Sequence, residues 1–416
     1  MTETLGERPW MTSAETRAVF DALEARGGPG CARFVGGCVR NTLLGARVDD
    51  IDIATPLTPD DVMQALKAAG LKVVPTGVEH GTVTAVSGGR PYEITTLRRD
   101  VETDGRRAVV AFTGDWHEDA ERRDFTMNAL YAGRDGAIFD PTGRGVDDAR
   151  AGRVIFVGDP HVRLAEDYLR ILRFFRFHAW YGRGAPDAAA LGACAAHKDS
   201  LSTLAAERIS KELLKLLAAE DPRQSVALMA ETGVLEALVP GATELSRFNA
   251  LVEIELEQLF SNDALLRLSA LTADDEVAAA RLAERLRLSN DQRDRLVASK
   301  GQSPRITSWM SPRELRRAVY RIGARAFADR VKLAWAASPR TATTPQWRGL
   351  LALGESWSPP AFPITGDDVM SAGVPKGPMV GQVLAEVEDW WIDHDFIDDK
   401  FSAIEKLKAV AQGMAY

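Results

Sequence analysis

Two aspartates one residue apart, Asp50 and Asp52, are the side chains of this 416-residue sequence best suited to chemistry. On a β-strand, residues two positions apart point to the same face of the sheet. Neighbouring carboxylates repel each other unless a cation lies between them, and Mg²⁺ prefers such oxygen ligands together with substrate phosphates. Two such ions can bind both the attacking and the leaving oxygen of a phosphoryl transfer. A lone Asp-x-Asp also occurs in many proteins that bind no metal, so the neighbouring residues decide its interpretation.

A Gly-Gly pair and an arginine precede these aspartates. Gly36 and Gly37 let the backbone approach a ligand closely and can direct amides at a phosphate, and Arg40 follows within one helical turn. The order Gly-Gly-x-Val-Arg, then Asp-x-Asp about ten residues later, resembles the opening of the nucleotidyltransferase fold shared by class II tRNA CCA-adding enzymes and bacterial poly(A) polymerases. In that family Asp usually follows the arginine, whereas this chain has Asn41 there.

The string ERRDFTMNAL at residues 121–130 matches the family's next motif, RRDFTxNA. Adjacent arginines before an acid suit a triphosphate, because guanidinium groups are planar, forked donors that stay charged. The resemblance implies nucleotide-binding roles for Arg123, Asp124 and Asn128. Glu93, on a predicted strand, is a candidate third catalytic carboxylate near the metals, and a solvent-facing strand acid is an equally good interpretation.

A further motif, EDYLRILR at residues 166–173, matches the family's EDxxRxLR. On a helix, Asp167 and Arg170 are three residues apart and share a face. Cytosine and adenine both present an amino donor beside a ring-nitrogen acceptor, which a carboxylate and a guanidinium match, whereas guanine and uracil present the reverse. In isolation the pair would be an ordinary ion pair, but the motifs before it favour selection of CTP and ATP. The resemblance assigns Arg173 to a nucleotide phosphate.

The elements that must position these residues follow from pattern. Residues 33–160 combine short β-branched runs with Gly- and Asp-rich turns, and strands are predicted at 33–35, 51–54, 82–86, 92–96, 108–112 and 137–139. From about residue 163 onward, apolar residues recur at three- and four-residue steps, which indicates helices. The predicted class is α+β, a mixed α/β nucleotidyltransferase head with a small sheet followed by all-α parts. The predicted divisions are an N-terminal helical segment (1–25), the head (26–160), a neck with base recognition (161–220), an RNA-binding body (221–350) and a tail (351–416).

The net charge of −8 alone argues against a nucleic-acid partner, but the charge is unevenly placed. A basic segment, residues 281–332, holds 14 Lys and Arg against five Asp and Glu, whereas residues 355–400 hold two against ten. By the resemblance, the basic segment faces tRNA, and we therefore predict that Arg316 and Arg317 bind RNA. A solvated basic helix face is the alternative interpretation.

Composition indicates where such a protein works. Three cysteines without a Cys-x-x-Cys pair indicate a reducing compartment and no disulfide framework. The first residues lack the features of a secretory signal. Apolar runs stay shorter than the about 18 residues of a membrane-spanning helix. We therefore expect a cytoplasmic protein with no membrane partner and no DNA partner.

The resemblance implies one reaction, the addition of C, C and A to the tRNA 3′ end from CTP and ATP, with release of pyrophosphate. It implies Mg²⁺ as cofactor, bound by Asp50 and Asp52, and contact with the acceptor stem. Two alternatives stay open. A poly(A) polymerase, or an enzyme adding only CC or only A, shares the head motifs, and a long basic tail, typical of the poly(A) members, is missing here. An RNA-binding relative without catalysis is opposed by the intact motifs.

Overall fold

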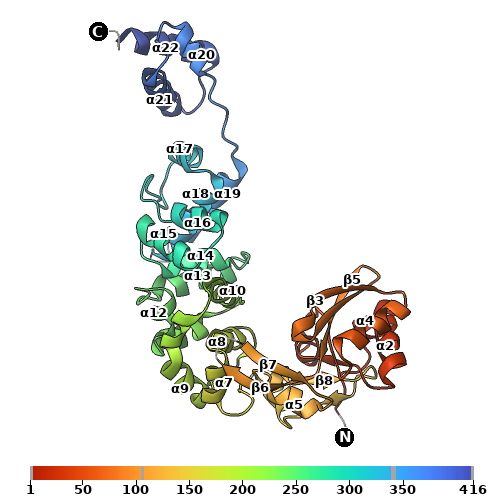
Figure 1. The fold of residues 1–416 in the computed structure, drawn as a ribbon. Helices are drawn as coiled ribbons and strands as arrows, with labels where there is room; N and C mark the ends of the chain where they lie inside the picture. Colours follow the sequence, from red (N-terminus) through yellow and green to blue (C-terminus); the bar gives the residue numbers. More distant parts are fainter. Residues whose placement is uncertain (1–2, 105–106, 339–342, 414–416) are drawn as a thin grey trace. The chain divides into compact units, whose positions relative to one another are not determined.

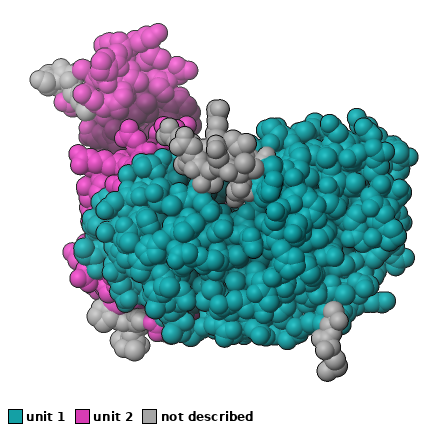
Figure 2. Space-filling model, turned by 60° about the horizontal axis from the view of Figure 1, so that its bottom comes forward, with its two compact units in different colours: residues 1–243 teal, residues 244–416 magenta. Residues whose placement is uncertain are grey.

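The computed structural model describes residues 3–104, 107–338 and 343–413. Figure 2 shows its two compact units, residues 1–243 in teal and residues 244–416 in magenta. Every described strand lies in the first unit, and the described part of the second is built from helices (Figure 1). The predicted α+β class, with a head containing a small sheet followed by helical regions, is confirmed. The division after Thr243 falls inside the predicted body, residues 221–350. The predicted domain boundaries stay proposals.

The head is built on a seven-stranded sheet in the order β3-β4-β5-β2-β1-β8-β9, and β6 and β7 form a separate ribbon. Strands β2 and β5 run parallel, and the other paired strands run antiparallel. All six predicted strands are present. The sequence analysis missed β3, an edge strand that contains a proline, together with β6 and β8. The strands are β1 (Arg33–Val35), β2 (Asp52–Thr55), β3 (Lys72–Gly77), β4 (Thr82–Ser87), β5 (Arg90–Thr96), β6 (Arg98–Asp104), β7 (Arg107–Phe112), β8 (Tyr131–Ala132) and β9 (Ile138–Phe139).

Two helices, α2 (Ala14–Gly27) and α4 (Pro59–Ala68), pack against each other and against the strands at one end of the sheet (Figure 1). Thr58 caps α4 as its sequence indicates, because its hydroxyl accepts from the amide of Asp61 and Pro59 occupies the first turn. The amide of Leu5 donates to the carbonyl of Gly136 at 2.9 Å. The N-terminal segment, predicted as helical, contains α1 and α2 and bonds to the head, and its boundary at residue 25 stays a proposal.

The helix α8 organises the rest of the first unit. It packs on α10 and α11. Phe174, Phe175 and Phe177 are buried, as predicted, and Phe174 and Phe177 contact Phe125 of the head. The other helices of this unit are α1 (Pro9–Thr12), α3 (Gly37–Leu43), α5 (Trp116–Glu121), α6 (Gly145–Ala151), α7 (Pro160–Glu166), α8 itself (Leu169–Tyr181), α9 (Ala188–His197), α10 (Ala206–Leu217), α11 (Arg223–Glu231) and α12 (Val234–Leu238), with 3₁₀ turns η1 (Val78–His80), η2 (Thr126–Asn128) and η3 (Lys198–Thr203).

The second unit has two parts with separate cores. The last three helices enclose a core of their own that includes Val369, Val387 and Leu407. A stretch without regular structure precedes them, where the Ser-Pro and Pro-Pro breaks predict a linker. No described helix is long and apolar enough to cross a membrane. The helices are α13 (Ser246–Glu257), α14 (Ala264–Leu271), α15 (Glu276–Arg285), α16 (Asn290–Ala298), α17 (Pro312–Ile322), α18 (Ala324–Ala336), α19 (Thr344–Ser356), α20 (Gly366–Ser371), α21 (Pro378–Asp393) and α22 (Lys400–Gly413).

Candidate active site

Three carboxylates come together at the start of β2. Asp52 is the first residue of this strand and lies opposite Glu93 in the parallel pair with β5. Asp50 lies just before the strand, which begins at Asp52, so the same-face geometry predicted for the two aspartates does not rest on one strand. Burial, followed by the negative charges of Glu93 and Asp50, raises the pKa of Asp52 to about 6. Ile51 and Ile53 on either side of Asp52 are almost fully buried, as is the rest of β2, so Asp52 stands where this buried strand begins.

The donor set fits a divalent cation. The side chains of Asp50 and Glu93 are exposed, and neither has a hydrogen-bond or ion-pair partner in the described chain. The described residues contain no group of three or more His, Cys, Asp or Glu side chains that could hold an ion by itself. One or two carboxylates completed by water and substrate phosphates are the coordination that Mg²⁺ usually takes. The uncompensated negative charge around Asp52 is what such an ion would balance.

A glycine brings the backbone close to an arginine. Gly36 has φ 67° and ψ −116°, a conformation available essentially to glycine, and a Cβ built on it would lie 3.7 Å from Nη1 of Arg123. The amide of Gly36 donates to the carbonyl of Leu130 at 3.0 Å, so it is already used within the fold. Gly37 begins α3. Gly36 is therefore required by its backbone conformation, and it lies in van der Waals contact with Arg123 at the end of β1.

The guanidinium of Arg123 is held by two side chains that the sequence analysis did not single out. Its Nε and Nη2 donate to Oδ2 of Asp119 at 3.2 and 2.9 Å, and Tyr131 donates its hydroxyl to the same oxygen at 2.6 Å. Burial opposes the positive charge of Arg123, but Asp119 and Tyr131 outweigh it and raise the pKa. The i,i+4 spacing of Asp119 and Arg123 was the available signal for this contact. Asp119 is thus a positioning residue for Arg123.

We expect Asp119→Asn to raise the KM for nucleotide by about tenfold with a smaller change in kcat, because loss of an orienting partner typically costs 10–100-fold. Steady-state kinetics of nucleotide incorporation measure both constants. The matched control is Asp148→Asn, since Asp148 is also fully buried and pairs with two arginines elsewhere in the head. That control should lower thermal stability and leave KM unchanged. Equal KM values for Asp119→Asn and the parent would contradict the positioning role.

Four of the predicted nucleotide-binding residues form one hydrogen-bonded chain between α3 and α8. Asn128 accepts from Arg40 through its Oδ1 and donates to Asp124 at 2.9 Å. Asp124 in turn accepts from Nε of Arg173 at 2.8 Å. Burial favours the neutral acid, but the charge of Arg173 outweighs it and lowers the pKa of Asp124. The motif residues therefore fix α8 against the head in addition to any contact with a nucleotide.

Arg40 is buried and fully engaged. Its Nη2 donates to the hydroxyl of Tyr181 and to Oδ1 of Asn41, both at 2.9 Å, and its guanidinium lies 4.2 Å from the centroid of the Tyr181 ring. Burial lowers the pKa of Arg40. Asn41, which stands where the family usually has Asp, thus keeps the supporting contact through its amide oxygen. Tyr181 is a second residue that the sequence analysis missed.

The predicted base-selecting pair lies at a break between two helices. Asp167 has an extended backbone between α7 and α8, so the two residues do not share one helix face as predicted. Its carboxylate pairs with Arg208 at 2.8 Å and accepts from the amide of Leu169 at 3.1 Å. Arg170 donates to the carbonyls of Arg163 and Arg122 at 2.8 and 3.2 Å and also pairs with Glu166. Separate partners therefore hold the carboxylate and the guanidinium.

The two predicted RNA-binding arginines lie on α17 and pair with acids of the tail. Arg316 Nε donates to Asp395 at 2.8 Å, and Arg317 pairs with Asp393. We call residues 386–399 the acidic segment. Further contacts join α17 to it, from Arg313 to the carbonyl of Asp393, from Tyr320 to Glu388 at 2.5 Å, and from Arg321 to Asp389 at 2.8 Å. The positive charges of α17 and the negative charges of the acidic segment therefore partly neutralise each other within the second unit.

Comparison with known proteins identifies the family. Residues 32–155 match the model for the poly A polymerase head domain, and residues 186–245 match the one for the probable RNA and SrmB-binding site of polymerase A. The chain is 33% identical to the mitochondrial CCA tRNA nucleotidyltransferase 1 of Mus musculus, covering 90% of this chain and 86% of the relative. It is 32% identical to the CCA-adding enzyme of Levilactobacillus brevis, covering 89% and 91% of the two chains.

A solved structure agrees with these relatives. The Bacillus stearothermophilus CCA-adding enzyme, determined in complex with CTP, superposes with a TM-score of 0.79 at 26% identity, covering 98% of this chain and 99% of that one. Its similarity extends over head and helical parts alike, whereas the two family models cover less than half of the sequence. Together with the carboxylates, Arg123 and the motifs around them, these matches show that the chain belongs to the CCA-adding tRNA nucleotidyltransferase family.

Proposed function

We propose that this chain adds C, C and A to the 3′ end of tRNA from CTP and ATP. In each step the RNA 3′-oxygen forms a bond to the α-phosphorus, the bond to the β-phosphate oxygen breaks, the hydroxyl proton leaves and pyrophosphate is released. The observation that carries the proposal is the set of three carboxylates, Asp50, Asp52 and Glu93, close to Arg123 in a chain of this family. Carboxylates that could hold a divalent metal, beside an arginine that could hold a triphosphate, suit transfer of a nucleotide to an RNA hydroxyl.

The family generally uses a divalent metal, and we propose Mg²⁺ held by Asp50 and Asp52. Bound there, it would lower the pKa of the RNA hydroxyl and balance the charge of the leaving pyrophosphate. Arg123 would donate to the triphosphate, and Asp119 would hold the guanidinium of Arg123 in its orientation. Glu93 would complete the negative wall around the metal. The remaining proposed nucleotide contacts are Gly36, Gly37, Arg40, Asp124, Asn128, Asp167, Arg170 and Arg173.

The test is incorporation of each labelled triphosphate, supplied singly and in pairs, into a tRNA that lacks its 3′ CCA. We expect CTP alone to extend the tRNA by two residues, and CTP with ATP to extend it by three and stop. Long A-tracts on any RNA would instead indicate a poly(A) polymerase, and extension by two or one residues only would indicate a CC- or A-adding enzyme. No incorporation with Mg²⁺ present would overturn the catalytic proposal.

A cytoplasmic location is proposed from the sequence and is supported by three free, buried cysteines, which need no oxidising compartment. The mouse relative carries a mitochondrial name. Fluorescence microscopy of the tagged protein in its native organism distinguishes a cytoplasmic from an organellar location.

RNA binding by Arg316 and Arg317 is a proposal that their pairing with the acidic segment makes testable. We expect the double variant Arg316→Ala/Arg317→Ala to weaken binding of tRNA by about tenfold, because two phosphate contacts are lost. The matched variant Asp393→Asn/Asp395→Asn removes the same ion pairs but keeps the arginines. It should bind tRNA at least as well as the parent in a fluorescence anisotropy titration. Equal weakening by both variants would show that the pairs only attach the tail.

A further inference from the structure

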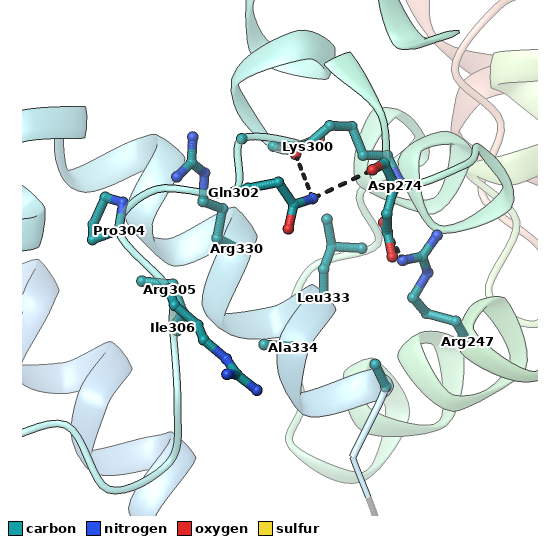
Figure 3. A pocket seen from close by; sticks show the side chains of 13 residues that line it. Arg247, Asp274, Lys300, Gln302, Pro304, Arg305, Ile306, Arg330, Leu333 and Ala334 are labelled. Carbon is teal, nitrogen blue, oxygen red and sulfur yellow. Dashed lines mark hydrogen bonds and ion pairs between the residues drawn. The ribbon is translucent and has the colours of Figure 1, made fainter. Parts of the chain in front are cut away.

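A cavity of about 160 Å³ lies in the second unit, apart from the residues described above (Figure 3). Its walls come from α13, the end of α16, the segment that follows α16, and α18. Its volume is many times the 10–15 Å³ that one water needs, on the order of a phosphate group with its hydration. Its charged lining consists of four cations and one acid, Arg247, Lys300, Arg305, Arg330 and Asp274.

Two of these cations are held by several contacts within the protein. The Nζ of Lys300 donates to the carbonyls of Ser269 and Thr272 at 2.6 and 2.8 Å and to Asp274 at 3.3 Å. Arg247 donates to the carbonyl of Thr272 at 2.7 Å and also pairs with Asp274. One carboxylate therefore serves two cations, and this wall of the cavity keeps a net positive charge.

The other two cations keep donors that the described chain does not use. Arg330 is nine-tenths buried and donates from Nε to the carbonyl of Ala298 at 2.7 Å and from Nη1 to that of Ser303 at 2.8 Å. No carboxylate in the described chain forms an ion pair with it, although burial lowers its pKa and the charge of nearby Glu276 opposes that effect. Its Nη2 lies over Gly301, where a Cβ would stand only 1.7 Å away. Arg305 is exposed and has neither a hydrogen bond nor an ion pair within the described residues.

Most other arginines of the basic segment are already neutralised. The carboxylates that pair with them belong to neighbouring helices and to the acidic segment. The pairs are Arg293 with Asp294, Arg295 with Asp263 and Asp329, Arg325 with Asp291, and the α17 arginines with the acidic segment. Arg281 on α15 is exposed and has no partner in the described chain, but it lies outside the cavity. The unpaired donors of Arg305 and Arg330 are thus concentrated at one hollow site.

We propose that this cavity binds one phosphate of an RNA backbone, with Arg305 and Arg330 as the donors. Guanidinium groups match phosphate oxygens with paired N–H donors and keep their charge on burial. The positive wall of Lys300 and Arg247 adds attraction for an anion without forming a contact. Gly301 is required because only a residue without a Cβ leaves space for the Arg330 fork. The assignment of RNA as the polyanion rests on the proposed function, whereas the anion site itself does not.

The experiment compares Arg305→Ala and Gly301→Ala with the parent and with Arg348→Ala, the matched control, an exposed arginine on α19 outside both the basic segment and the cavity. Fluorescence anisotropy gives the affinity for a tRNA lacking CCA at several salt concentrations. We expect Arg305→Ala to bind about fivefold more weakly and to lower the slope of log affinity against log salt by about 0.9, the value for one phosphate contact. Gly301→Ala, which displaces Arg330, should weaken binding to a similar extent, and Arg348→Ala should leave affinity and slope unchanged.

Three further readings decide the outcome. Circular dichroism and thermal unfolding establish that the Gly301→Ala chain is folded, and Arg305→Ala, an exposed change, serves alone if it is not. Calorimetric titration of the parent with inorganic phosphate tests for a free anion: phosphate binding lost in Arg305→Ala, with tRNA affinity unchanged, would overturn the RNA assignment. Unchanged tRNA affinity and slope in both variants, together with no phosphate binding that depends on Arg305, would overturn the site. Incorporation of CTP by the parent is measured separately, so a failure of the proposed reaction stays distinguishable.

Discussion

Replacing Asp50 or Asp52 by alanine is expected to lower nucleotide incorporation by about 10³-fold or more, because metal-ion catalysis contributes several kcal/mol to the transition state. Both residues lie beside Glu93, and burial, followed by the charges of Glu93 and Asp50, raises the pKa of Asp52 to about 6. Removing one acid relieves the repulsion between these carboxylates, so the variants should be at least as stable as the parent while binding the metal less well. Single-turnover incorporation of CTP into truncated tRNA measures the effect.

The design contains its own control. Asp49 precedes Asp50 directly, is exposed and pairs with Arg47 at 2.5 Å. Asp49→Ala should therefore keep the parent's rate. Binding of tRNA, measured by anisotropy, should be unchanged in all three variants, which separates loss of chemistry from loss of the complex. Near-normal turnover in either Asp50→Ala or Asp52→Ala would refute the metal assignment.

The second large effect concerns the choice of base. Asp167→Ala or Arg170→Ala should raise incorporation of UTP and GTP relative to CTP and ATP by about tenfold to 100-fold, because an unpaired buried polar group costs about 1–3 kcal/mol. In the parent, the wrong base leaves such groups unpaired, and the variants remove that penalty. The ratio of kcat/KM values for the four triphosphates measures it directly.

Arg176 provides the matched control for this experiment. It lies on the same helix as Arg170 and also pairs with a glutamate, Glu212, at 2.5 Å. Arg176→Ala should alter rate or stability but leave the ratio among the four triphosphates as it is. A ratio that stays unchanged in Asp167→Ala and in Arg170→Ala would exclude the protein-templated selection of the base.

Local pattern was sufficient for much of the head. Asp52 stands between two buried apolar residues, Ile51 and Ile53, a pattern that the sequence itself displays. The cap at Thr58 can likewise be recognised from a single turn of sequence. The strands that were missed lack such signals, since β3 is a partly exposed edge strand and β8 has only two residues. Local sequence patterns therefore predicted which strands and helices exist better than they predicted the residues where each begins and ends.

Contacts between distant residues were not predictable in this way. Glu93 could be a metal-site acid or a surface acid until the parallel pairing of β2 with β5 placed it opposite Asp52. In the same way, Asp395 is 79 residues from Arg316, and nothing local connects them. Asp167, at the break between α7 and α8, likewise pairs with Arg208, which lies 41 residues away. These relations arise from tertiary packing, which a single sequence does not display.

The pairing between α17 and the acidic segment changes how the protein should respond to salt. Tight binding of RNA normally gains from the release of mobile ions, and each neutralised phosphate contributes to the salt slope. Arg316 and Arg317 already have tethered counterions in Asp395 and Asp393. An RNA phosphate that replaces a tethered carboxylate exchanges one fixed anion for another and frees little bulk salt. Contacts at α17 would therefore persist in concentrated salt, whereas a contact at Arg305, which has no such partner in the described chain, would be lost first.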